Sequence, residues 1–206
     1  MCVNAKVSIT SFIVAIVSSL VLIFYGNKKY SKENLSTGIF FIYVGFMQLF
    51  EYFIWIDLDN KKGLNKFASI LAPLFIMNQP TVLYLIKSII FNKNYIFLMI
   101  MNIIYFFVMM YQYSIYLNTE KLITGVGEKY LHWKWNKYLN VYYSYAILFI
   151  INILIYFNIN YALLVLILGG ITYIISQKIT NIDYNSVWCL FGANIPIFIC
   201  IGSYFV

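Results

Sequence analysis

The sequence predicts an all-α fold: a polytopic membrane protein with seven transmembrane helices, arranged as 3+1+3 parallel repeats. Three observations predict this fold. Hydrophobic residues make up 63% of the 206-residue chain and charged residues 10%, and the mean hydropathy of +0.81 is far above the range of soluble domains. Apolar runs of about 20 residues, enough to cross a bilayer, recur along the chain. A seven-residue motif also occurs twice, each time inside such a run.

The apolar runs are continuous and do not alternate with polar residues, which indicates helices, because lipid offers no hydrogen-bond partners to an open backbone. The whole chain, 1–206, is predicted to be a single transmembrane domain. The first run is too long for the apolar region of a cleavable signal peptide, so we expect it to remain as a span. The expected spans are 7–25, 35–57, 67–90, 95–116, 141–157, 161–176 and 186–206.

The charges set the expected orientation. All fourteen cations are lysines and the net charge is +7. Each lysine lies beside a predicted span end and no long cluster forms, so nucleic-acid binding is not expected. Nine lysines fall on the N-terminal side of the predicted membrane and five on the other, which predicts a cytoplasmic N-terminus. The five are Lys28, Lys29, Lys32, Lys93 and Lys87, and the last of these is expected to snorkel to the interface.

The repeated motif is Leu-Phe-x-x-Asn-x-Pro, and it places the same polar and helix-bending residues in the third and seventh spans. Splitting the chain at its longest predicted loop, 117–140, leaves repeats 7–90 and 141–206 with 95–116 as a linker helix. The two copies consist of Leu74, Phe75, Asn78 and Pro80, and of Leu190, Phe191, Asn194 and Pro196.

The motif prolines are predicted helix kinks. Pro80 removes a backbone donor and clashes with the carbonyl of Ile76, and Pro196 does the same to Gly192. Each bend is therefore expected to free a carbonyl near the middle of the membrane.

The motif asparagines are predicted to bind a polar solute. Asn78 and Asn194 each add an amide that donates and accepts hydrogen bonds, while Trp55 and Trp188 offer aromatic faces for stacking. Proline bends and buried asparagines also serve plain helix packing, so that interpretation stays open.

Glu51 is the acidic residue placed well inside a predicted span, where a carboxylate costs about 2.5–3.5 kcal/mol on insertion scales. Gln48, Glu51, Tyr52 and Trp55 follow the i, i+3, i+4, i+7 spacing and share one helical face. Glu51 with Gln48 is a predicted proton site, and the alternative is a protonated structural group bonded across helices.

The sequence predicts neither a metal site nor a cofactor. His132 is the single histidine, and the three cysteines do not supply a ligand cluster around it. With one histidine and no nucleophile–base spacing, the chain is not expected to be an enzyme. The pair Gly169–Gly170 is predicted to allow a close approach of two helices, with a hinge as the alternative.

The 3+1+3 arrangement, with Asn78 and Asn194 in the third and seventh helices, resembles the SWEET and PQ-loop transporters. This resemblance implies that both asparagines contact the solute and that the two helix triplets rock about it. The segment 47–55, with Gln48, Glu51 and Trp55, also looks like uncharacterised seven-span proteins of protists and large DNA viruses, a resemblance that carries no activity.

We therefore expect an integral, multi-pass membrane protein that acts as a facilitator or proton-linked carrier of a small polar solute through a central pocket. The alternative is a non-transporting structural or partner-binding protein of a cellular or viral membrane. The expected partners are the lipid bilayer, the solute, and either a second copy of the chain or another membrane protein.

Overall fold

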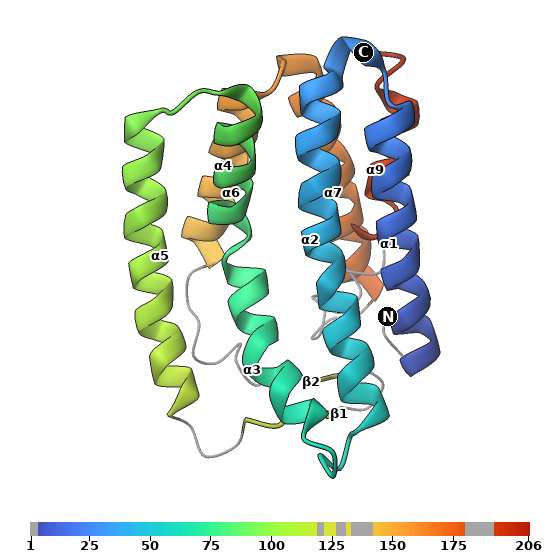
Figure 1. The fold of residues 1–206 in the computed structure, drawn as a ribbon, viewed down its shortest axis with the longest axis vertical. Helices are drawn as coiled ribbons and strands as arrows, with labels where there is room; N and C mark the ends of the chain where they lie inside the picture. The colour runs from blue at the N-terminus through green and yellow to red at the C-terminus, as the bar shows by residue number, and fades with distance from the viewer. Residues whose placement is uncertain (1–3, 119–121, 127–130, 133–141, 180–191) are drawn as a thin grey trace.

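The computed structural model describes residues 4–118, 122–126, 131–132, 142–179 and 192–206. These residues form an all-helical bundle whose helices lie side by side (Figure 1). The short strands β1 (Gly125–Val126) and β2 (Leu131–His132) form an antiparallel pair at one end of the bundle. The predicted all-α fold class is confirmed.

Four helices are long and apolar enough to cross a membrane, or five if the bent pair of α3 and α4 counts as one span. The chain is therefore a multi-pass membrane protein by the length and apolarity of its helices. The long helices are α1 (Ala5–Tyr25), α2 (Ser31–Ile56, after the short 3₁₀ turn Lys28–Tyr30), α5 (Ile96–Leu117) and α7 (Ile159–Ile179). The bent pair is α3 (Leu64–Met77) and α4 (Gln79–Phe91).

The number of seven spans stays a prediction, because the fifth and seventh apolar runs do not form full-length spans within the described residues. The fifth apolar run forms α6 (Tyr142–Tyr156), whose 15 residues are short for a span. The seventh run ends in α9 (Ile195–Gly202), and its residues 186–191 lie outside the described residues.

Helices that follow each other in the sequence pack against each other, and α9 packs on α1 to close the ring. Further contacts join helices that are not consecutive: α2 touches α4 and α9, α3 touches α5, and α4 touches α6. Aromatic and aliphatic side chains fill the interior in two clusters. One is centred on Phe40, Tyr84 and Phe157, and the other on Phe50 and Met109.

Small residues bring α1 and α2 close together. A side-chain carbon placed on Gly38 would lie 2.4 Å from the side chain of Ile23 and 3.0 Å from the carbonyl oxygen of Ser19. Carbons placed on Gly169 and Gly170 would meet no described atom within 4 Å, so the close approach predicted at that pair is not found among the described residues. Tight helix contacts lie at other glycines instead, among them Gly38 and Gly202, whose added carbon would lie 2.8 Å from the side chain of Leu164.

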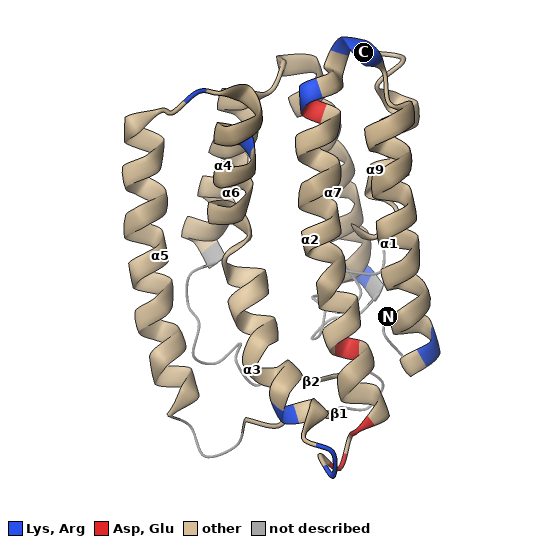
Figure 2. Cartoon of the chain, viewed as in Figure 1, with Lys and Arg blue, Asp and Glu red and all other residues tan. Residues whose placement is uncertain are grey.

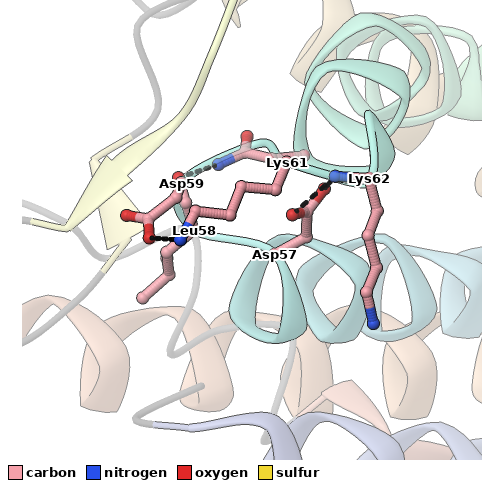
Figure 3. Close-up of polar contacts among 6 residues, drawn as sticks. Asp57, Leu58, Asp59, Lys61 and Lys62 are labelled. Carbon is pink, nitrogen blue, oxygen red and sulfur yellow. Dashed lines mark hydrogen bonds and ion pairs between the residues drawn. The ribbon is translucent and has the colours of Figure 1, made fainter.

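Asp57 joins α2 to α3 at the end of the bundle opposite the C-terminus (Figures 1 and 3). Its carboxylate accepts hydrogen bonds from the backbone N–H of Lys62 at 3.1 Å and of Leu64 at 2.9 Å, so it satisfies donors where α3 begins. Burial alone would raise the pKa of Asp57, but these backbone hydrogen bonds outweigh it, and the pKa lies below its usual value. The neighbouring Asp59 and Lys61 form an exposed ion pair at 3.5 Å (Figure 3).

Candidate functional site

The third predicted span is broken at Asn78, as the motif predicts. Helix α3 ends at Met77, α4 begins at Gln79, and the two helices meet at a bend of 56°. The Asn78 N–H still donates to the carbonyl of Leu74 at 3.2 Å, and the Asn78 carbonyl starts the next helix by accepting from the N–H of Val82 at 2.9 Å. Pro80 is the second residue of α4, where its missing N–H costs nothing.

The carbonyls freed by the break are bonded to tyrosine hydroxyls. Tyr105 from α5 donates to the carbonyl of Met77 at 2.7 Å, and Tyr43 from α2 donates to that of Phe75 at 2.8 Å. The sequence predicts that Pro80 frees the carbonyl of Ile76, because proline lacks the N–H that would bond to it. The end of α3 instead leaves its last carbonyls without partners inside the helix, so other helices supply them.

Pro73, which the motif does not include, produces a second set of such contacts. It lies inside α3 and leaves the carbonyl of Ser69 without its helical donor, and the hydroxyl of Tyr116 bonds to that carbonyl at 2.9 Å. Tyr113 donates to the carbonyl of Ile70 at 2.8 Å. The sequence signal for these contacts was the spacing of tyrosines along the fourth apolar run, which puts Tyr105, Tyr113 and Tyr116 on one helical face.

The second copy of the motif has the same local geometry where it is described. Asn194 immediately precedes α9, with φ −96° and ψ −10°, and Asn78 precedes α4 with φ −80° and ψ −3°. Pro196 is the second residue of α9, as Pro80 is of α4. The carbonyl before each asparagine accepts from a hydroxyl of another helix: Tyr105 in the first copy, and Ser18 in the second, at 2.8 Å from Ala193. Three residues of the second copy or its surroundings, Leu190, Phe191 and Trp188, lie outside the described residues.

The described packing does not bring the two asparagines together. Helix α9 packs on α1, α2 and α7, whereas α3 and α4 pack on α2, α5 and α6. Asn78 donates its side-chain N–H to the carbonyl of Leu74 in its own helix at 3.0 Å, and its buried Oδ1 has no partner among the described residues. Asn194 is half-buried at the start of α9.

The predicted proton site lies deep in the bundle on α2. Gln48 and Glu51 are both 1% exposed, and Trp55 at the end of the same face is half-buried. Gln48 lines a narrow crevice with Val44 of α2 and Ala193 of the second motif, and this crevice leaves no room for a water molecule. Helix α2 therefore brings Gln48, but not Asn78, close to the second copy of the motif.

A chain of buried polar contacts, which we call the α4–α6 seam, continues from the break along α4. It consists of Gln79, Pro80 and Lys87 from α4 and of Tyr145 and Asn152 from α6. Gln79 Oε1 accepts from the hydroxyl of Tyr145, the Pro80 carbonyl accepts from Asn152 Nδ2 at 3.2 Å, and the Asn152 carbonyl accepts from Lys87 Nζ at 3.0 Å.

Two polar atoms of the seam have no partner among the described residues. These are the donor Gln79 Nε2 and the acceptor Asn152 Oδ1, in side chains that are 1% and 0% exposed. Buried polar groups are nearly always hydrogen-bonded, so an unpaired donor and an unpaired acceptor in one helix interface are exceptions to that rule.

The prediction that Lys87 snorkels to the interface is wrong. The side chain is 0% exposed, and Nζ lies 3.5 Å from the ring centroid of Phe157 in addition to its bond with Asn152. Helical side chains tilt toward the N-terminus of their helix, which on α4 points back into the bundle. Asn152 also lies in the last turn and a half of α6, whose negative dipole end favours a cation.

Sequence reasoning identified Pro80 as a kink and placed Lys87 at the interface, but it missed Gln79, Tyr145 and Asn152 as site residues. Asn152 is a lone asparagine in the fifth apolar run, which could have marked it, but nothing in the sequence pairs it with Gln79 or Lys87. Comparison of the chain with protein-family models, with curated proteins and with solved structures found no match.

Proposed function

We propose that this membrane protein is a facilitator or proton-linked carrier of a small polar solute, and that the break at Asn78 with the α4–α6 seam is part of its solute site. The observation that carries the proposal is the buried pair of unpaired atoms, Gln79 Nε2 and Asn152 Oδ1, directly beside a broken span.

The energetics of these two atoms favour a bound molecule. A buried donor or acceptor without a partner costs about 1–3 kcal/mol, and a solute hydroxyl, which both accepts and donates, would recover that cost by bonding to both atoms. Membrane carriers commonly bind solutes and ions where a transmembrane helix is interrupted near the middle of the bilayer. The 56° bend between α3 and α4 is such an interruption.

The packing of the helices supports a two-repeat arrangement for this carrier. The first helix of the first repeat, α1, lies against the last helix of the second, α9, and in the same way α6 lies against α4. Asn78 and Asn194 occupy equivalent turns in the two repeats. We propose that they mark two half-sites separated by α2, and that opening the crevice beside Gln48 would connect them.

Glu51 is the proposed proton site of this carrier, one turn along α2 from Gln48. Both side chains are buried, and a carboxyl group in such a place exchanges its proton with a large change in solvation. Proton coupling predicts that solute uptake into proteoliposomes depends on an imposed pH gradient and that Glu51→Gln abolishes this dependence. Equal responses of the wild type and Glu51→Gln would remove the proton role.

The first experiment is thermal unfolding of the purified protein in detergent with a panel of sugars, amino acids and organic ions. A solute that binds only the folded state raises the melting temperature, and the rise grows with the ratio of solute concentration to Kd. We expect one class of solute to stabilise the wild type, and Asn78→Ala or Gln79→Leu to abolish that effect. Asn160→Ala is the matched control, because Asn160 is exposed at the start of α7.

Two outcomes would contradict the proposal. Stabilisation by no solute would favour the alternative of a structural or partner-binding membrane protein. A solute that stabilises the wild type and both site variants equally would place its binding site elsewhere.

A further inference from the structure

Lys87 is a fully buried cation within the α4–α6 seam. Its side chain is 0% exposed, and Nζ has two neighbours: the carbonyl oxygen of Asn152 at 3.0 Å and the ring centroid of Phe157 at 3.5 Å. An ammonium group carries three N–H donors, and the carbonyl takes one of them. Lys87 therefore retains donors for a further acceptor.

No carboxylate among the described residues forms an ion pair with Lys87. The ion pair that the described residues do form, between Lys61 and Asp59, lies on the surface. Glu33 of α2 acts electrostatically on Lys87, but its Oε1 accepts from the backbone N–H of Asn158 at 3.4 Å, where α7 begins. A buried lysine keeps its charge only with a close negative partner, so an anion beside Lys87 would stabilise its ammonium form.

The seam supplies the other groups that such an anion would need. Asn152 connects them: its Nδ2 bonds to Pro80, the neighbour of Gln79, and its carbonyl bonds to Lys87. Lys87 can donate to a carboxylate, while the unpaired Oδ1 of Asn152, whose carbonyl is bonded to Lys87, can accept from a hydroxyl or amino group. A cation and an acceptor together match a small carboxylate that carries a hydroxyl or amino group beside it.

The charge at this end of the bundle would attract the same kind of molecule. The α1–α2 and α4–α5 connections lie at the same end of the bundle (Figure 1). Exposed lysines occur in these connections and at the start of α2: Lys28, Lys29, Lys32 and Lys93. Figure 2 shows positive charge in both connections and an acidic position next to a basic one at the start of α2. A surface with this excess of positive charge raises the local concentration of anions.

We propose that Lys87 pairs with the carboxylate of the solute, and that the solute is therefore a small hydroxy- or amino-carboxylate. The inference rests on the proposed function and names its solute class. Lys87 binds the carboxylate, and Asn152 Oδ1 accepts from the adjacent hydroxyl or amino group. Admission of the solute requires α4 and α6 to separate where Asn152 joins them.

The test compares lactate and alanine with lactamide, which keeps the hydroxyl group and lacks the negative charge. Binding is measured by thermal shift and by titration calorimetry on the full-length protein in detergent. We expect lactate or alanine, and not lactamide, to stabilise the wild type. Loss of one partner of a buried charge pair weakens binding by at least about 30-fold, so Lys87→Met should lose the shift, while Lys87→Arg should keep part of it. Lys32→Met, which removes an exposed lysine, is the control.

Each contrary outcome has a distinct meaning. If a carboxylate stabilises the wild type and Lys87→Met equally, Lys87 is not the pairing group. If lactate and lactamide stabilise the wild type equally, the protein does not recognise the negative charge and the carboxylate inference is wrong. This comparison uses the wild type alone, so it holds even if Lys87→Met does not fold. If only neutral solutes bind, and Gln79→Leu abolishes their binding, the proposed function holds and the carboxylate inference is wrong. If neither kind of solute binds, both are wrong.

Discussion

Replacing Tyr105 by phenylalanine tests whether tyrosine hydroxyls hold the broken span in place. The hydroxyl of Tyr105 donates to the carbonyl of Met77 at 2.7 Å, and Met77 is the last residue of α3, so no residue of that helix replaces the lost donor. Tyr105 is 4% exposed, which means that water does not replace the donor either. The variant therefore leaves a buried carbonyl unsatisfied.

The expected loss of stability follows from that geometry. An unsatisfied buried carbonyl costs about 1–3 kcal/mol in soluble proteins, while hydrogen bonds between membrane helices average about 0.6 kcal/mol and reach about 1.7 kcal/mol. We therefore expect Tyr105→Phe to cost about 1–2 kcal/mol, since its acceptor lies at a helix break. For a chain of this length, that cost lowers the melting temperature by about 2–8 °C.

The assay is thermal unfolding in detergent across four matched variants of α5. Tyr116→Phe should resemble Tyr105→Phe, because Pro73 removes the helical donor to Ser69. Tyr113→Phe should cost less, because Ile70 lies inside α3 and its carbonyl keeps the N–H of Leu74 as a helical partner. Tyr111→Phe should have almost no effect, because Tyr111 is 68% exposed on the outer face of the same helix. Equal melting temperatures for Tyr105→Phe and Tyr111→Phe would refute the reasoning.

Two further predictions concern helix packing and the α2–α3 connection. Gly38→Ala should destabilise the protein by about 1–3 kcal/mol through overpacking against Ile23, whereas Gly169→Ala should be neutral or slightly stabilising in the same thermal assay; equal effects would contradict the assigned α1–α2 contact. Asp57→Asn should lower the melting temperature at neutral pH, because it removes the ionised carboxylate that accepts the backbone hydrogen bonds. The pKa of Asp57 is lower in the folded state than its usual value of 3.8, so the carboxylate stabilises the fold above pH 3.8. This stabilisation is lost as the pH falls through the lower folded-state pKa. The melting temperature of Asp57→Asn should accordingly fall less than that of the wild type as the medium is acidified below pH 3.8, and Asp59→Asn, which removes an exposed carboxylate of the same turn, should behave as the wild type.

The two proposals depend on different atoms of the same interface and can fail separately. The proposed carrier function needs the break at Asn78 and the unpaired Gln79 and Asn152, with no requirement on charge. The carboxylate inference needs the ammonium of Lys87 as well. Solute panels that include neutral and anionic members therefore distinguish them in one series of measurements.

The sequence by itself determined the helical class, the membrane location and the position of the break at Asn78. These features follow from local physics: apolar runs must satisfy their backbone internally in lipid, and proline lacks the donor that a continuous helix needs. The matching turns at Asn78 and Asn194 were predicted for the same reason, since a turn depends on the few residues that form it.

Only the tertiary structure decided which side chains bond to the carbonyls freed at the break and which helix Lys87 contacts. Tyr43 and Tyr105 reach the freed carbonyls from 32 and 28 residues away in sequence, and Lys87 reaches Asn152 across 65 residues. No local pattern encodes such pairs, because they depend on how the helices rotate and slide against each other when the bundle packs. From the sequence alone, a lysine four residues from the end of its helix can either snorkel to the interface or be buried. The packing of α4 against α6 buries Lys87.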